Sequence, residues 1–552
     1  MMNERKKQTL YEGASVLLIS TVLAKIISAI FKIPLSSNAC LGDIGFGYFS
    51  AAHDFFTPFH MMAISGFSVA VSKVVADYTA VNGFKDAEKA FKLSRKLLLW
   101  FSIAFAIILA IVIVPFVKAT DITGQSIYSY FAMIPCVIFC FIASAYRGYY
   151  EGLGNMNPAA VTNIIEALAK LVLGFGSALI VVKITNNFAF AAAAATLGIT
   201  FGALLSLIYF YIKYKVSGGI TNAELKKSTP QKKDNEIIKS LVLVSIPIVL
   251  SSVASSVVTL VDAITVRWQL SGEIMSLARF YPEFVMNLEE LPTLLYGIRS
   301  KAFTLYNLVP TLTMVVGVGA IPVLAEAFNK NETEELKEGI GSVFKLSALI
   351  TLPAAAGFIS LGERIMALLF GADASSQIGG KMLSLFGIAL IFSGIAIPLG
   401  SCLQALNLQN RALVNVAIGI GVKIILNLWL CSIPEINVFG SVYATVACYA
   451  VILVLHLLTL IMAYGKLKDL KNILLKPLLA SILCSVTAFL VSQLSLNSIV
   501  TVLSIVLGAM VYFAILIATK AFNDEDILAF PMGEKLLKIA KKLKFLKKSD
   551  KN

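Results

Sequence analysis

The chain has 552 residues, of which 58% are hydrophobic and only 14% charged, and its formal net charge is +14. A soluble domain could not bury so much apolar surface. Apolar stretches of about 18–25 residues recur along the chain, and each is long enough to cross roughly 30 Å of hydrocarbon. These stretches are continuous and do not alternate, which argues against a transmembrane β-barrel. The composition therefore predicts an all-α polytopic membrane protein.

Fourteen spans are predicted in chain order. The second is too long to be straight, and Pro58 and Gly66 offer places for it to bend. The predicted spans are 12–37, 44–77, 95–117, 125–147, 158–182, 188–212, 238–267, 301–327, 342–361, 382–406, 411–432, 438–464, 472–493 and 496–519.

Basic residues are distributed unevenly around these spans. If both termini are cytoplasmic, most of the 46 Lys and Arg lie in the tails and the even-numbered loops, as the positive-inside rule requires. The net positive charge therefore reflects topology and does not indicate nucleic-acid binding. The few basic residues on the opposite side would be Lys118, Lys183, Arg279, Arg299, Arg364 and Lys381.

The two halves of the chain resemble each other. FKLS at 91–94 recurs at 344–347, and the same offset of 253 aligns 151–170 with 404–423. Two distant matches that share one offset indicate a duplication, with both copies in the same membrane orientation. The predicted domains are an N-lobe (1–215), a cytoplasmic linker (216–237), a C-lobe (238–465), an appended pair of helices (466–520) and a basic tail (521–552).

The basic tail has its own pattern. Apolar residues at helical spacing alternate with lysines over 534–548, which favours an amphipathic helix on the anionic inner leaflet. The alternative is a soluble basic tail.

The first span carries two lysines where a membrane helix usually excludes charge. Lys25 and Lys32 are seven residues apart, so they share one helix face and lie roughly 10 Å apart along it. A lysine at the bilayer centre costs about 2.5–3.5 kcal/mol, so such residues normally face protein or water. Lys32 could instead extend to the outer surface. For Lys25, well inside the span, we expect a role facing a lumen.

Further charges lie within or beside other spans. Lys73 is near the cytoplasmic end of the second span and Arg147 ends the fourth. Glu166 precedes Lys170 by four residues, the spacing of an intrahelical ion pair that could be purely structural.

The remaining candidates include most of the acids. Asp262 and Arg267 end the seventh span, where Arg267 could simply be solvated, and the second span contains His53 and Asp54. The intramembrane balance is cationic, which suits an anionic substrate such as a diphosphate. The four residues His53, Asp54, Glu166 and Asp262 are candidates for coupling or gating.

No enzyme motif competes with this interpretation. The chain shows no P-loop, no HExxH pair and no nucleophile elbow, and its three histidines are too scattered to suggest a metal centre. The sequence therefore predicts no enzyme activity, no metal site and no organic cofactor.

Several segments carry a family resemblance. AKIISAIFKIPL (24–35), LGDIGFGYFSAAHDFF (41–56) and above all RGYYEGLGNMNPAA (147–160) resemble the SpoVB/MurJ-like branch of the MOP exporter superfamily. The likeness covers nearly the whole chain. It implies two pseudo-symmetric six-helix lobes in a V around a central cavity, with two further C-terminal helices.

The resemblance also implies a function. Such proteins flip undecaprenyl-diphosphate-linked sugars, lipid II among them, from the inner to the outer leaflet of the bacterial cytoplasmic membrane by alternating access. It implies a diphosphate-binding role for Lys25 and Lys32, and coupling to Na⁺, H⁺ or the membrane potential. Family members carry basic residues in the second and eighth helices, where this chain has His53 and Asp54, and Tyr306 and Asn307.

Two other functions remain open from the sequence. One is a cation-coupled multidrug or metabolite exporter, which would rely on Asp54 or Asp262. The other is a scaffold for a cell-wall or sporulation complex. Besides the lipid-linked sugar, anionic membrane lipids and cell-wall synthesis proteins are the expected partners.

Overall fold

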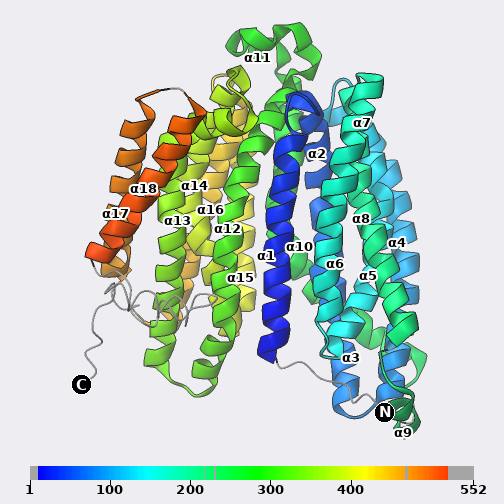
Figure 1. Cartoon of the computed structure of the whole chain (residues 1–552). Helices are drawn as coiled ribbons and strands as arrows, with labels where there is room; N and C mark the ends of the chain where they lie inside the picture. The colour runs from blue at the N-terminus through cyan, green and yellow to red at the C-terminus, as the bar shows by residue number, and fades with distance from the viewer. Residues whose placement is uncertain (1–9, 218, 229–231, 466–469, 496, 520–552) are drawn as a thin grey trace, which may run out of the picture. The chain divides into compact units, whose positions relative to one another are not determined.

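The computed structural model describes residues 10–217, 219–228, 232–465, 470–495 and 497–519. Within these ranges every regular element is a helix (Figure 1). The predicted tail helix at 534–548 lies outside the described residues. The helices fall into two compact units, one holding residues up to Ser300 together with Asn427–Val438, the other Lys301–Leu426 and Phe439 onward.

The first unit is built from the N-terminal helices and α10. These are α1 (Leu10–Leu35), α2 (Gly42–Met61), η1 (Met62–Phe67), α3 (Ser68–Ala80), α4 (Phe84–Thr120), α5 (Ile127–Gly152), α6 (Asn157–Ala169), η2 (Lys170–Gly174), α7 (Phe175–Thr185), α8 (Phe188–Ser217), α9 (Asn222–Lys227), α10 (Asp234–Gly272), α11 (Ile274–Phe280) and η3 (Pro282–Glu290).

The second unit holds the C-terminal helices, and two helices contribute to both units. The shared helices are α12 (Leu291–Asn329) and α15 (Gln409–Leu430), and the short turn η4 (Asn437–Phe439) lies at the third crossing between the units. The others are α13 (Thr333–Phe370), α14 (Ala374–Ala405), α16 (Gly440–Tyr464), α17 (Leu470–Ser492) and α18 (Ser498–Ala518).

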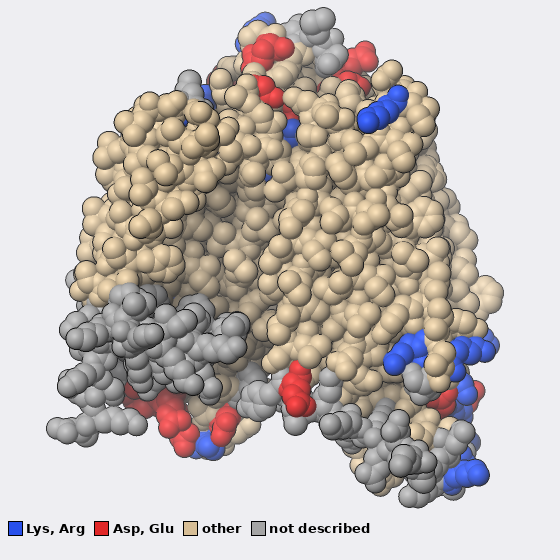
Figure 2. All heavy atoms as spheres, in the orientation of Figure 1, with Lys and Arg blue, Asp and Glu red and all other residues tan. Residues whose placement is uncertain are grey.

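Thirteen helical stretches in the described chain are long and apolar enough to cross a membrane. They match thirteen of the fourteen predicted spans. The helix at the seventh predicted span, α10, has 39 residues but is not among the thirteen, so the count of fourteen stays a prediction. Figure 2 shows charged side chains gathered toward the two ends of the helices, with a broad uncharged belt between them. The protein is a multi-pass helical membrane protein.

The predicted duplication is visible in the helix boundaries. Adding 253 to the bounds of α4 gives 337–373, and α13 runs over Thr333–Phe370. The same shift moves α5 to 380–405, and α14 runs over Ala374–Ala405. The packing units do not coincide with the predicted lobes, because α10 packs on α2, α3 and α4 of the first unit. The predicted domain boundaries stay a prediction.

The RGYYEG segment forms the contact between α5 and α3. Gly148 and Gly152 face α3 so closely that a Cβ on either would collide with a backbone oxygen, that of Ser68 or Ser72. Small residues four apart let two membrane helices approach in this way. The same turn of α5 supplies the ion pair between Arg147 and Glu151, whose Nε–Oε1 distance is 3.1 Å.

Two π-helical segments interrupt the long helices of the first unit. The segment η1 lies between α2 and α3, close to the bend expected at Pro58 or Gly66, and η2 begins at Lys170. Short π-helical turns inside α-helices are frequent at functional sites, because they change the direction in which later side chains point.

Candidate functional site

The basic residues of α1 are positioned by a parallel neighbour. Asn163 of α6 donates hydrogen bonds to Ser20 and Thr21, at 3.2 and 3.3 Å. Eleven residues further along both helices, the ring of Phe31 packs against Gly174 of η2. The constant difference of 143 residues (163 − 20 and 174 − 31) shows that α1 and α6–η2 run parallel and in register.

That register places a third lysine beside α1. Lys170 falls level with residue 27 (170 − 143), so it lies between the levels of Lys25 and Lys32. All three side chains are half-buried or intermediate in exposure. Seven residues of helix separate the two α1 lysines by roughly 10 Å, and Lys170 lies within that interval.

The two α1 lysines lie away from the apolar face of their helix. Exposed apolar side chains form one stripe on α1, and at about 100° per residue both lysines are roughly 140° from its centre. The stripe consists of Ile19, Leu23, Ile26 and Ile30. On the same helical wheel both lysines lie within roughly 40° of Thr21, which accepts a hydrogen bond from Asn163 of α6.

The nearby charges act on one another. Lys32 is subject to the attraction of Asp54 and the repulsion of Lys170. Among the residues that the structure describes, neither Lys32 nor Lys170 has a carboxylate within the 4.0 Å of an ion pair. Two like charges in a poorly solvated region are unfavourable unless an anion compensates them.

Asp54 is held by its neighbours on α2 and α12. Its Oδ1 lies 3.2 Å from Nδ1 of His53, and its Oδ2 accepts a hydrogen bond of 2.9 Å from the hydroxyl of Tyr296. The start of α12 approaches α2 closely, because a Cβ on Gly47 would collide with the backbone oxygen of Thr293. Gly47 therefore serves the close packing of α2 against the start of α12.

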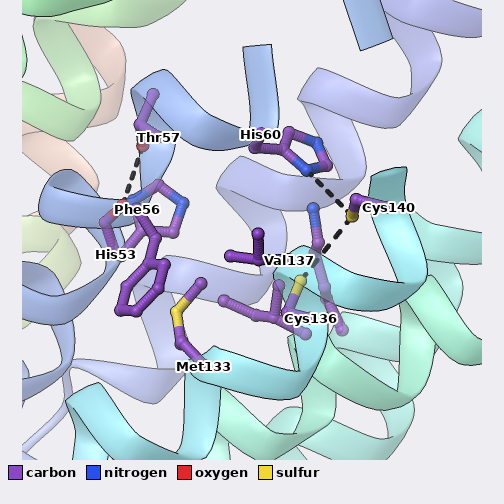
Figure 3. A pocket seen from close by; sticks show the side chains of 10 residues that line it. His53, Phe56, Thr57, His60, Met133, Cys136, Val137 and Cys140 are labelled. Carbon is purple, nitrogen blue, oxygen red and sulfur yellow. Dashed lines mark hydrogen bonds between the residues drawn. The ribbon is translucent and has the colours of Figure 1, made fainter. Parts of the chain in front are cut away.

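A small polar cavity adjoins Lys170 (Figure 3). Its volume is about 40 Å³, and His53, His60, Cys140 and Lys170 are its main polar lining residues. In Figure 3 His60 and Cys140 point toward each other, with Nδ1 and Sγ 3.4 Å apart. At roughly 10–15 Å³ for each water molecule, the cavity has room for about three waters. Water in this cavity would solvate the amine of Lys170 within the membrane-spanning part of the unit.

Arg147 belongs to a separate network that joins four helices. It bonds to Glu151 on its own helix and donates to Oδ1 of Asn163 at 3.1 Å. Glu151 also accepts a hydrogen bond of 3.0 Å from Ser68 on α3, and Asn163 reaches α1. This arrangement fixes the helices that carry the lysines, and Arg147 itself is buried and paired.

The expected Glu166–Lys170 ion pair does not form. Glu166 lies 4.0 Å from Nε2 of His60 instead. The π-helical segment begins at Lys170, and this local change in winding separates two side chains that an unbroken α-helix would place together. Lys73 is exposed on α3, and the structure does not bring it to the lysines of α1.

The charges at the end of α10 are internal ion pairs. Arg267 is fully buried, not solvated as one alternative held, and its Nη2 lies 3.4 Å from Oδ2 of Asp121. Asp262 pairs with Arg299 of α12 and accepts a hydrogen bond of 2.9 Å from Asn427. Arg267 and Arg299 are therefore each paired with a buried carboxylate, that of Asp121 and that of Asp262 respectively.

Sequence reasoning missed the place of Arg299. It was assigned to an outer loop, but it lies inside α12 and is fully buried. The signal that could have found it is the mostly apolar segment LPTLLYGI (291–298), which continues directly into the predicted span at 301. His60 was likewise not considered as a site residue.

Two protein families match this chain. The family described as "Polysaccharide biosynthesis protein" matches residues 10–328, more than half of the chain. The chain belongs to this family. A second family, "Lipid II flippase MurJ", matches residues 305–517. Together with the relatives below, these matches place the chain in the SpoVB/MurJ-like branch of the MOP superfamily.

Individual relatives are distant but cover most of the chain. "Uncharacterized membrane protein YabM" of Bacillus subtilis is 25% identical over 97% of this chain and 98% of its own. "Stage V sporulation protein B" of the same organism is 24% identical over 82% and 84%. The solved structure "Lipid II flippase MurJ, inward closed conformation" has a TM-score of 0.65 at 17% identity and covers 90% of this chain and 97% of its own. That likeness shows a shared fold.

Membership of this superfamily settles the broad class. Its members are transporters, so the chain is a membrane transporter and not an enzyme, as the absence of catalytic motifs predicts.

Proposed function

We propose that this chain flips an undecaprenyl-diphosphate-linked saccharide of the lipid II type from the inner to the outer leaflet by alternating access. The families that match support a flippase for lipid-linked sugars. The finer assignment, to a diphosphate-linked saccharide, rests on the chemistry of the first unit.

The observation that carries the proposal is the pair of Lys32 and Lys170. Their ammonium groups repel each other across α1 and η2, and no described carboxylate within 4.0 Å neutralises either. A diphosphate diester is doubly anionic and has several acceptor oxygens, so it would relieve this repulsion. Lys25 lies about two helical turns from Lys32 on the same face of α1. It would therefore contact the headgroup at a different stage of the passage across the membrane.

The rest of the cluster would tune this site. Asp54 attracts Lys32 and is itself fixed by His53 and Tyr296. The small cavity beside Lys170 would keep its amine hydrated when no headgroup is bound. Lys73, Arg147 and Arg267 are the other basic residues that the sequence offers as headgroup ligands. Lys73 is exposed and the two arginines are paired internally, so we assign the main role to Lys25, Lys32 and Lys170.

The test is lipid flipping by the full chain in proteoliposomes, measured with a fluorescent undecaprenyl-diphosphate saccharide. Lys32→Gln and Lys170→Gln should each weaken headgroup binding at least roughly tenfold, because a charge-assisted hydrogen bond contributes about 1.5–3 kcal/mol. The matched control is Lys183→Gln, which removes an exposed lysine from the last turn of α7. Normal flipping by both site variants, or an equal loss in the control, would contradict the diphosphate role.

The multidrug-exporter alternative makes the opposite prediction. It requires a membrane acid such as Asp54 or Asp262, and both of these are already bonded to neighbouring side chains. The flippase proposal assigns headgroup binding to the lysines and not to this acid, so Asp54→Asn should spare headgroup flipping. Export of a cationic drug that Asp54→Asn abolishes, with flipping undetectable in the parent chain, would favour the exporter.

The proposal includes a membrane location and an energy source. We infer the bacterial cytoplasmic membrane with both termini inside, and coupling to Na⁺, H⁺ or the membrane potential. The cell-wall synthesis proteins that would supply and use the lipid are the inferred protein partners.

A further inference from the structure

A second polar cavity lies in the second unit, among helices that the flipping mechanism above does not use. Its volume is about 590 Å³, within the range of roughly 300–1,000 Å³ typical of ligand sites. It is bounded by the C-terminal parts of α13 and α17 and the N-terminal parts of α14 and α16. All four ends are on the outer side in the predicted topology.

The floor of the cavity combines basic and hydroxyl groups. Arg364 and Lys381 contribute two positive charges against one acid, Glu363, and Ser360, Ser384 and Gln493 add polar groups. Arg364 is fixed by a hydrogen bond of 2.8 Å from Nη1 to the backbone oxygen of Ser495. A guanidinium has five N–H donors in a planar fork, so others remain to bind phosphate oxygens.

The geometry of this floor is set by close packing. Gly362 of α13 and Gly380 of α14 approach so closely that a Cβ on Gly362 would lie 2.5 Å from the backbone oxygen of Gly380. Ser384 donates a hydrogen bond of 3.1 Å to the backbone oxygen of Phe358. Arg364 and Lys381 therefore extend from two helices whose spacing is fixed at this point.

The other side of the cavity is apolar and exposed. Phe489, Tyr443 and Ile359 are 48%, 44% and 44% exposed, although all three line the cavity. Tyrosine is typical of the membrane–water interface, where its ring meets hydrocarbon and its hydroxyl meets water. A ligand that fits must therefore be anionic at one end and apolar at the other.

We propose that this cavity binds the phosphate headgroup of an anionic glycerophospholipid of the outer leaflet. The phosphate would lie between Arg364 and Lys381, and an acyl chain would run along Phe489 and Ile359. This lipid is a resident ligand of the second unit, distinct from the substrate proposed for the lysines of the first. Its place in the outer leaflet follows from the predicted orientation.

The experiment is native mass spectrometry of the purified full chain with phosphatidylglycerol or phosphatidylcholine added. The wild-type protein should retain phosphatidylglycerol in preference to phosphatidylcholine. Lys381→Gln should reduce retention several-fold, and Arg364→Gln with Lys381→Gln at least tenfold. Lys381 is exposed, so the single variant should fold even if the double does not.

Matched controls separate this site from general charge effects. Arg279→Gln removes an exposed positive charge from α11, in the outer segment of the first unit, and should leave retention unchanged. Any lipid held by the basic tail is the same in every variant. Unchanged retention in Lys381→Gln and in the double variant, or an equal loss in Arg279→Gln, would overturn the proposal.

A competition arm distinguishes a resident phospholipid from the transported lipid. An undecaprenyl-diphosphate saccharide added in excess should leave bound phosphatidylglycerol in place in Lys32→Gln, Lys170→Gln protein. Displacement in that background would assign the cavity to the transported lipid instead. Displacement by inorganic phosphate alone would show a simple anion site and would equally contradict a lipid ligand.

Discussion

Asp262 lies between donors from two other parts of the chain, Arg299 of α12 and Asn427 at the end of α15. Removing one member of a buried ion pair leaves an uncompensated charge, which costs about 3–5 kcal/mol. Arg299→Gln should therefore lower the unfolding temperature of the detergent-solubilised protein markedly. The double variant with Asp262→Asn should recover part of this loss, because no isolated charge remains.

An exposed ion pair provides the comparison. Glu326, in the last turn of α12, and Lys330, directly after this helix, are exposed and 2.8 Å apart, and solvent screens such pairs. Lys330→Gln should leave the unfolding temperature unchanged within error. If Arg299→Gln behaved in the same way, the buried pair would have no structural role.

Asp121, between α4 and α5, gives a pH-dependent prediction. Burial alone would raise the pKa of its carboxyl, but the Arg267 guanidinium and hydrogen bonds from Ser126 and Thr123 outweigh burial and hold the pKa below its usual range. The stabilisation is therefore complete above the unfolded pKa of about 3.9 and is lost as pH falls through the folded pKa. Asp121→Asn should be less stable than wild type at pH 7, and the difference in unfolding temperature should narrow below about pH 4. A difference that stays constant with pH would contradict this.

The sequence shows which charged residues lie in the membrane-spanning helices, but not which of these charges are neutralised by a partner side chain. Two lysines on one face of a membrane helix are visible from their spacing. Glu151, four residues from Arg147, is a partner that helix spacing can predict. Asn163 lies 16 residues from Arg147 and Asp121 lies more than 100 residues from Arg267, so no local pattern reveals these two partners. The proximity of Lys170 to Lys32 depends on the register between α1 and α6, which is likewise a tertiary property.

At the scale of helices, the contact between α5 and α3 depends on two glycines. Gly148→Ala would place a methyl group against the backbone oxygen of Ser68, and Gly152→Ala would place one 2.5 Å from that of Ser72. Overpacking of this kind costs about 1–3 kcal/mol. Each variant should show a lower unfolding temperature and a smaller yield of monodisperse protein.

Gly176 of α7 is the matched control, because nothing lies within 4 Å of the Cβ that alanine would add there. Gly176→Ala should be neutral or stabilising by about 0.5–1 kcal/mol, since alanine favours the helix. Equal destabilisation by all three substitutions would mean that the close approach of α3 and α5 is not what the glycines provide.

The positions of the helices can be predicted from the sequence, whereas the π-helical turns within them cannot. Long apolar runs and the offset of 253 anticipate the helices of both halves, because hydrophobic length and duplication are properties of the sequence itself. The π-helical turns η1 and η2 have no such signature. They arise from packing against neighbouring helices, as at Gly66, whose added Cβ would lie 2.9 Å from Val249 of α10.

For the whole molecule, the orientation in the membrane underlies both proposals and can be tested directly. The seven native cysteines are all buried, so the parent chain should react little with a membrane-impermeant maleimide. Arg279→Cys, on exposed α11, should be labelled in intact cells. Asn235→Cys, exposed in the first turn of α10, should be labelled only after the membrane is permeabilised.

This pattern follows from the charge distribution, because lysines and arginines cluster in the segments placed inside and the positive-inside rule resists their translocation. Labelling of Asn235→Cys in intact cells would show that the topology is the reverse of the predicted one. The cavity of Arg364 and Lys381 would then lie at the inner leaflet, and Lys25 would precede Lys32 from the outside. In that reversed orientation, a headgroup that starts on the cytoplasmic side would meet Lys32 before Lys25. The order in which the two lysines act therefore depends on this measurement.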